Sequence, residues 1–170
     1  TLTCKEGSTF RQEGTSQVLL TENSELILEP GSEYTLTDNA KLIVANGCKL
    51  YVQPGAALNI QNGGQLIIES GAVAMIYDTV KMGSDANLLI RAGGRLLVDG
   101  GSLTTTSDAA LWEGIFVEGD RNQHQTATHQ GVVELKNGAI IENARCAITT
   151  NSLDARSRSI KKKHIFAPEF

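Results

Sequence analysis

The sequence predicts an all-β fold, a parallel β-solenoid with three faces, from three observations. Apolar and polar residues alternate over short segments, which is the pattern of a β-strand. A Gly or Asn closes each segment, and the turn residues recur every 24 residues. Eight residues therefore make one strand and one corner, and three such octads make one coil. An antiparallel meander would account for the period of 8 but not for the period of 24.

Six consecutive octads run from Ser24 to Gly71. The third and fifth positions of each octad are apolar and are predicted to point inward, with the residue between them pointing outward. The eighth position is Gly or Asn, which tolerate the positive φ that a corner requires. The slower period appears in Pro30-Gly31, which recurs as Pro54-Gly55. The predicted inward pairs are Leu26/Leu28, Tyr34/Leu36, Leu42/Val44, Leu50/Val52, Leu58/Ile60 and Leu66/Ile68.

The repeat loosens after residue 71. Residues 72–83 and 84–93 are each interpreted as one longer unit with a single strand, and the octad returns at 94–101 and 131–138. Residues 121–130 are polar and have no periodicity, so we expect one long loop there.

Three regions follow from this pattern. Residues 1–23 are predicted to form an N-terminal cap, because they show no octad and a solenoid must cover its core. The β-helix is predicted over 24–153. Residues 154–170 form a basic tail of net charge +3, which leaves −7 for residues 1–153 because the whole chain carries −4. We expect this tail to be disordered or packed on the solenoid.

Composition excludes several classes of function. A net charge of −4 argues against a nucleic acid or an acidic membrane surface as partner. No apolar run approaches the roughly 20 residues of a membrane-spanning helix, so we expect a soluble protein. The chain starts at Thr1 without a Met or a charged-then-apolar leader, which we interpret as an excised domain or a mature form.

Metal and cofactor chemistry is not indicated. The three cysteines show no metal-ligand spacing and pair with no histidine at a zinc-like interval. Cys4, Cys48 and Cys146 are expected to be small buried side chains, with a Cys4–Cys48 disulfide as the alternative in an oxidising compartment.

Stacking residues 24 apart predicts which outward side chains share a face. Tyr51 falls on the first face, Phe116 on the second, and Ile43, Ile67 and Leu97 on the third. An outward apolar column should not face water without a cover. We therefore expect the third face either to lie under the cap or tail, or to serve as a docking or self-association surface.

The few aromatic residues are the candidates for ligand binding, since they make up only 5% of the chain. Tyr51 and Phe116 occupy outward positions, and Tyr77 and Trp112 flank strands near turns. An aromatic ring offers a flat platform for the apolar C–H face of a sugar. The alternative is structural, with Trp112 filling a corner and Phe116 lying under the loop. The polar contacts to a sugar are assigned to Asp120, Asn122, Gln123 and His124.

The octads with Leu-x-Val cores and Pro-Gly or Asn-Gly corners resemble secreted bacterial right-handed parallel β-helix domains. So does the string Trp112-x-Gly114-Ile115-x-Val117-x-Gly119, with the later GVVELKNGAIIENARCAI. The resemblance covers about residues 24–150 and implies the right-handed coil. Within this group the chain is similar to the β-helix carbohydrate-binding modules of secreted enzymes that degrade plant polysaccharides. That similarity implies xylan as ligand, secretion and a covalently linked catalytic domain, but it assigns no binding residue.

Three functions remain open at this point. The first is a non-catalytic module that binds a plant cell-wall polysaccharide, with xylan as the favoured ligand. The second is a structural or adhesive surface domain. The third is a fragment of a polysaccharide lyase or hydrolase, which is disfavoured because the carboxylates are scattered along the chain rather than paired.

Overall fold

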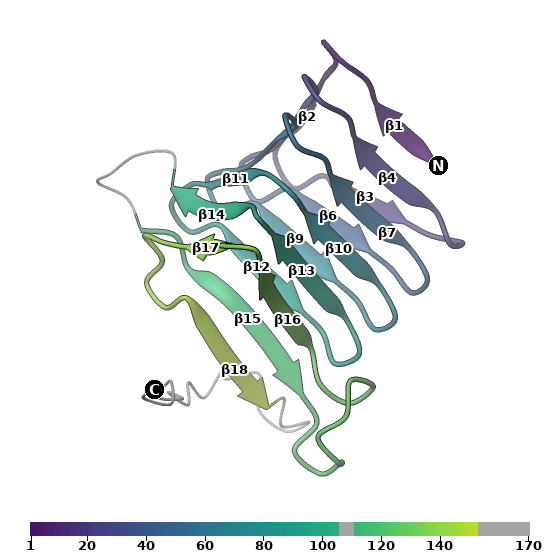
Figure 1. Ribbon diagram of the computed structural model, residues 1–170, viewed down its shortest axis with the longest axis vertical. Helices are drawn as coiled ribbons and strands as arrows, with labels where there is room; N and C mark the ends of the chain where they lie inside the picture. The colour runs from purple at the N-terminus through teal and green to yellow at the C-terminus, as the bar shows by residue number, and fades with distance from the viewer. Residues whose placement is uncertain (106–110, 153–170) are drawn as a thin grey trace.

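The structure, a computed structural model, describes residues 1–105 and 111–152 (Figure 1). All regular elements in these ranges are β-strands, which form three parallel sheets, A, B and C, of six strands each. The chain passes from A to B to C and then repeats, so it winds through about 5 turns of a solenoid. The predicted all-β solenoid with coils of about 24 residues is confirmed.

The strands of each sheet follow one another along the axis of the solenoid. Sheet A contains β1 (Leu2–Cys4), β4 (Glu25–Leu28), β7 (Lys49–Val52), β10 (Val73–Ile76), β13 (Arg95–Asp99) and β16 (Val132–Lys136). Sheet B contains β2 (Thr9–Gln12), β5 (Glu33–Leu36), β8 (Ala57–Ile60), β11 (Thr79–Met82), β14 (Ser102–Thr105) and β17 (Ile140–Ile141). Sheet C contains β3 (Gln17–Leu20), β6 (Lys41–Val44), β9 (Gln65–Ile68), β12 (Asn87–Ile90), β15 (Gly114–Gly119) and β18 (Ile148–Ser152).

The core lies inside the coils and is built from the inward positions that the octads predict. All twelve predicted inward residues are buried, from Leu26 to Ile68. The predicted corner residues adopt positive φ, with Gly31 at 76°, Asn39 at 70° and Gly55 at 85°. Burial of the inward pairs is the main stabilising term, because each coil removes Leu, Ile and Val side chains from water.

Residues 1–23 correct one prediction. They carry the repeat, as β1, β2 and β3 pair in parallel with β4, β5 and β6. The alternation is hard to see in the sequence because the first coil places a polar residue, Gln12, at an inward position. The other three residues of the same strand are exposed. The segment therefore forms the first coil of the solenoid and shares the repeat that the sequence analysis did not find in it.

Residues 72–83 correct a second prediction. They contain two strands, β10 and β11, joined by only two residues, and not one strand with a long turn. Because β11 was not counted as a strand, every later strand belongs to the sheet that follows the predicted one along the chain. Leu97 pairs with Met75 in sheet A, whereas Phe116 pairs with Leu89 in sheet C. The predicted column of Ile43, Ile67 and Leu97 is thus divided between two faces.

The cysteines of the described part are free thiols. Cys4 belongs to β1, whereas Cys48 precedes β7 and lies two coils further along, with its Sγ 3.6 Å from Ser24 Oγ. The alternative of a Cys4–Cys48 disulfide is therefore not realised.

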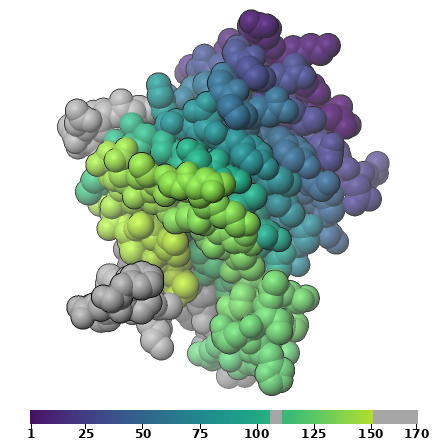
Figure 2. Space-filling view, viewed as in Figure 1, coloured from purple at the N-terminus to yellow at the C-terminus, as the bar shows by residue number. Residues whose placement is uncertain are grey.

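The long loop predicted over 121–130 is confirmed, apart from one isolated antiparallel bridge between Gln130 and Gly119. It connects β15 to β16 and forms the pale green lobe at the lower right of Figure 2. The predicted basic tail at 154–170 lies outside the described residues. Within the described ranges no helix is long and apolar enough to span a membrane.

Candidate functional site

Two of the four predicted aromatic residues, Tyr51 and Tyr77, each lie next to Met75 on the outer side of sheet A. Tyr51 points outward from β7 and is the register partner of Met75 on β10, which in turn pairs with Leu97 on β13. Tyr77 directly follows β10, and its hydroxyl lies 3.7 Å from Met75 Sδ. Both rings are half-buried. Met75 is therefore a common neighbour of two aromatic residues that are 26 positions apart in the sequence.

An apolar strip continues along sheet A on both sides of this pair. Ile27 on β4 is the register partner of Tyr51 on one side, and Leu97 follows Met75 on the other. Because neighbouring strands are about 4.8 Å apart, the strip from Ile27 to Leu97 is about 14 Å long. It runs along the axis of the solenoid, perpendicular to the strands.

Charged residues border the strip at the beginning of the strands. Lys49 Nζ lies 3.5 Å from Glu25 Oε1. The Tyr51 hydroxyl and then the Glu25 carboxylate raise the pKa of Lys49, because both favour its protonated form. On β16, the last strand of sheet A, the apolar strip ends at Glu134, the register partner of Leu97. Glu134 forms ion pairs with Arg95 and Lys136. The hydrogen bond from Lys136 and the charge of Arg95 lower the pKa of Glu134.

Trp112 does not belong to this surface, which corrects its assignment as a stacking platform. Its side chain is fully buried, and its indole Nε1–H donates to the Glu142 carbonyl oxygen over 2.9 Å. A ring with no accessible face cannot stack on a sugar. The structural alternative, in which Trp112 fills the interior beside a corner, describes its position.

Phe116 is half-buried and points outward from sheet C, so it lies on another face than Tyr51 and Tyr77. It extends an outward apolar column that also runs through Leu19, Ile43, Ile67 and Leu89. The continuous apolar face predicted from the sequence therefore exists, but its later members are Leu89 and Phe116 instead of Leu97.

The four predicted polar residues are all exposed in the β15–β16 loop. Asp120 organises the loop, because its Oδ1 accepts a hydrogen bond from the Asn122 N–H over 2.9 Å and its own N–H donates to the His129 carbonyl. The loop leads into the beginning of β16, whereas Tyr77 follows the end of β10. The structure therefore does not bring Asp120, Asn122, Gln123 and His124 next to the tyrosine pair.

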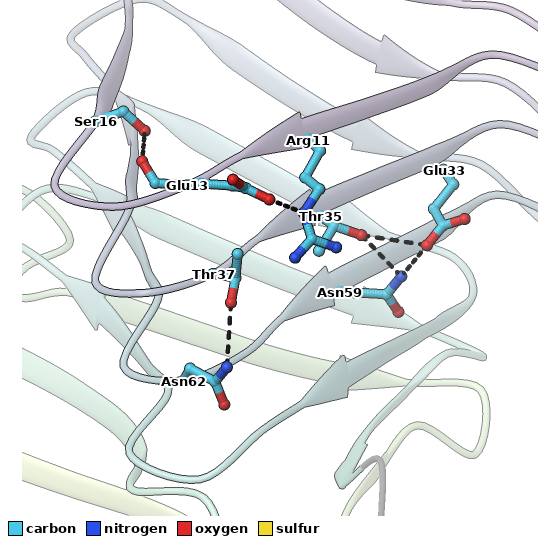
Figure 3. A network of polar contacts seen from close by, with 8 residues as sticks. All are labelled: Arg11, Glu13, Ser16, Glu33, Thr35, Thr37, Asn59 and Asn62. Atoms are coloured by element: carbon cyan, nitrogen blue, oxygen red, sulfur yellow. Dashed lines mark hydrogen bonds and ion pairs between the residues drawn. The ribbon is translucent and has the colours of Figure 1, made fainter.

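Sheet B carries a polar surface that the sequence analysis did not identify (Figure 3). Asn59 Nδ2 donates to Glu33 Oε1 over 2.8 Å and to Thr35 Oγ1 over 3.2 Å. Its outward column continues with Lys81 and Thr104 on the next two strands. This face was missed because β11 and β14 were not recognised as strands. Thr35 and Asn59 hold each other in place and are themselves largely covered.

One pair of carboxyl groups lies at the corner between sheets C and A. Arg91 is located between Glu69 and Glu118, 3.8 Å from Glu69 Oε1 and 2.5 Å from Glu118 Oε1. Burial raises the pKa of Glu118, and the charge of Arg91 opposes that rise. An arginine shared by two carboxylates is an ion-pair network that stabilises a corner.

The comparisons add no family to these observations. No protein-family model matches the chain, and neither the curated proteins nor the solved structures contain a significant match. Among the described residues, no group of three or more His, Cys, Asp or Glu side chains is arranged to hold a metal ion.

Proposed function

We propose that this protein is a non-catalytic carbohydrate-binding module that recognises a plant cell-wall polysaccharide, with xylan as the favoured ligand. The observation that carries the proposal is the placement of Tyr51 and Tyr77 around Met75 on one outer face. Two aromatic rings on a regular β-sheet surface can stack on the sugar rings of a polysaccharide, whose units also repeat at a regular interval. The resemblance to β-helix carbohydrate-binding modules supports the same ligand class.

The strip on sheet A has dimensions that suit an extended polysaccharide. The strand spacing of about 4.8 Å is close to the length that one sugar ring adds to an extended β-glycan chain. A chain lying along the solenoid axis would meet Ile27, Tyr51, Met75 and Leu97 in turn, with Tyr77 beside Met75. Apolar C–H faces would stack on these side chains, and Lys49 and Glu25 would hydrogen-bond the hydroxyl groups at the edge.

The experiment that tests this proposal is affinity electrophoresis of the protein in gels that contain xylan, β-glucan, mannan, a cellulose derivative or pectin. We expect retardation in xylan gels, with no reducing ends or unsaturated products after prolonged incubation. Released product would favour the lyase or hydrolase hypothesis. Unchanged mobility in every gel would contradict the binding proposal.

Substitution of the two tyrosines locates the site. We expect Tyr51→Ala and Tyr77→Ala each to weaken binding about fivefold or more, because an aromatic stacking contact contributes about 1 kcal/mol beyond its buried area. Phe116→Ala is the matched control, as it removes a half-buried ring from sheet C. Affinities come from mobility against polysaccharide concentration. Loss of binding in Phe116→Ala alone would move the site from sheet A to sheet C.

A second candidate function is a structural or adhesive surface domain. The observation that favours it is the outward apolar column on sheet C, which includes Ile43, Ile67 and Leu89. Ile67 is itself only 7% exposed, so a partner would cover chiefly the half-buried Ile43 and Leu89. This function predicts partner binding or lateral self-association that Ile67→Asp abolishes, in a protein without affinity for any polysaccharide in the gels.

A further inference from the structure

The outer surface of sheet B differs from those of sheets A and C, because its central outward column is polar. Asn59 on β8, Lys81 on β11 and Thr104 on β14 are register partners in consecutive strands. Each of these strands has a neighbouring strand on both sides. The other outward residues of the same strands are Ala57, Thr79 and Ser102. Lys81 is therefore the one charged residue on an otherwise uncharged platform that is three strands wide.

The side-chain oxygen of Asn59 has no donor within the described residues. The Nδ2 of the same amide donates to Glu33 Oε1 over 2.8 Å and to Thr35 Oγ1 over 3.2 Å. A carboxylate only accepts hydrogen bonds, so the group that contacts Glu33 must be the amide nitrogen. The oxygen therefore points away from Glu33 and Thr35 on β5 (Figure 3), toward the side of β8 where β11 lies. It accepts no hydrogen bond from any described residue, although Asn59 is only 8% exposed.

Lys81 places a cation next to this acceptor. Its side chain is exposed and, in the part of the chain that the structure describes, forms no ion pair. The register places Lys81 one strand from Asn59 and one strand from Thr104, at intervals of about 4.8 Å. On the same face the hydroxyl oxygens of Thr79 and Ser102 lie 2.8 Å apart. The platform thus offers one acceptor, one cation and several hydroxyl groups across about 10 Å.

We propose that this platform binds a single acidic sugar unit, a uronic acid. Lys81 pairs with the carboxylate, and a ring hydroxyl group donates to Asn59 Oδ1, because a nearly buried acceptor without a donor is unfavourable. The hydroxyl groups of Ser102 and Thr104 exchange hydrogen bonds with the other ring hydroxyls. One lysine balances the single charge of a carboxylate, whereas it would neutralise only part of a phosphate. The site lies on another face than the tyrosines of sheet A and does not depend on them.

The charges around the platform favour an isolated acidic unit over a polymer that is acidic at every sugar. Glu33 is exposed on β5, and Glu142 is exposed directly after β17. These two strands border the platform on its two sides. A polyuronate lying along the column would bring further carboxylates close to both glutamates. The acidic sugar is therefore a side group or an end group of a glycan whose other units are neutral.

Nuclear magnetic resonance titration of the isotope-labelled protein with methyl glucuronoside tests this site. We expect saturable shifts of the backbone amide signals of β8, β11 and β14, together with the Asn59 side-chain amide signal. Methyl glucoside lacks the carboxylate, and acetate lacks the hydroxyl groups. Each of these two ligands is expected to bind about fivefold more weakly than methyl glucuronoside.

Substitutions separate this site from general charge attraction and from sheet A. Lys81→Gln is expected to weaken methyl glucuronoside binding about fivefold, because it removes the cation from an exposed position. Lys41→Gln is the matched control and is expected to bind as the wild type does. Lys41 is also an outward lysine without an ion pair among the described residues, but it begins β6 on sheet C. Asn59→Ala is expected to remove the preference for methyl glucuronoside over acetate, and Tyr51→Ala is expected to leave the titration unchanged.

Several results would overturn the proposal. Methyl glucuronoside that causes no saturable shift up to its solubility limit would do so, as would an equal affinity for methyl glucoside. Binding that is unchanged in Lys81→Gln would show that the cation is not used. Shifts centred on sheet A would place the acidic sugar beside the tyrosines. Tighter binding of polygalacturonate, counted per uronate unit, would contradict an isolated acidic unit.

Discussion

At the scale of single residues, Glu118 is a carboxyl group whose environment raises its pKa. Its side chain is buried at the corner between sheets C and A, where Arg91 donates to it and Glu69 lies on the other side of that arginine. Burial raises the pKa of Glu118, Arg91 opposes the rise, and the charge of Glu69 adds to it. The folded protein therefore holds this proton more tightly than the unfolded chain.

Glu118→Gln tests the direction of this shift. A raised folded pKa contributes stability that is complete below the unfolded value and is lost as the pH rises through the folded value. The free energy of unfolding of the wild type, relative to Glu118→Gln, is thus expected to increase as the pH falls from about 7 to about 4. Urea unfolding of both proteins at several pH values measures this difference in the free energy of unfolding. A difference that stays constant, or that decreases toward low pH, would contradict the assignment.

At the scale of elements, the connection between β10 and β11 is shorter than the equivalent connections in the two preceding coils. The connections β4–β5 and β7–β8 have four residues each, whereas Tyr77 and Asp78 alone connect β10 to β11. The two longer connections are joined by a backbone hydrogen bond, in which the Gly31 N–H of β4–β5 donates to the Gly55 carbonyl of β7–β8 over 2.8 Å. The short corner offers no equivalent carbonyl, and the Gly55 N–H donates to Asp78 Oδ2 over 2.5 Å instead.

Asp78→Ala is expected to lower the free energy of unfolding by about 1–3 kcal/mol, because it removes the acceptor for two backbone N–H groups. The second of these is the Thr79 N–H, which is 2.6 Å from Asp78 Oδ1. Asp78→Asn retains one acceptor oxygen and should lose less. Chemical denaturation of both variants measures the effect, and equal losses would show that the corner does not depend on the second acceptor.

At the scale of the whole molecule, each coil contacts only its neighbours, so stability depends on where along the axis a change is made. Leu66 is fully buried between two coils, whereas Leu2 has a coil on one side only. Leu66→Ala is expected to cost about 2–5 kcal/mol, and Leu2→Ala about 1 kcal/mol or less. Denaturant unfolding of both variants provides the comparison, and a larger loss in Leu2→Ala would contradict it.

What the sequence alone determined is the fold and its repeat. Alternation over four residues and a Gly or Asn at each corner are local properties, so they are visible without knowledge of any distant contact. The period of 24 then predicts which residues stack, as in the pairing of Leu26 with Leu50. It also places Tyr51 on the outside.

Only the tertiary structure decided the faces beyond residue 71 and the members of the candidate site. The two-residue connection hides β11 in the sequence, and a missed strand shifts the predicted face of every later strand by one. The burial of Trp112 and the pairing of Tyr51 with Met75, which Tyr77 also contacts, depend on coils that are stacked in space. Exposure depends on stacking in the same way, since Leu2 and Leu26 are register partners and only Leu26 has a described coil on both sides.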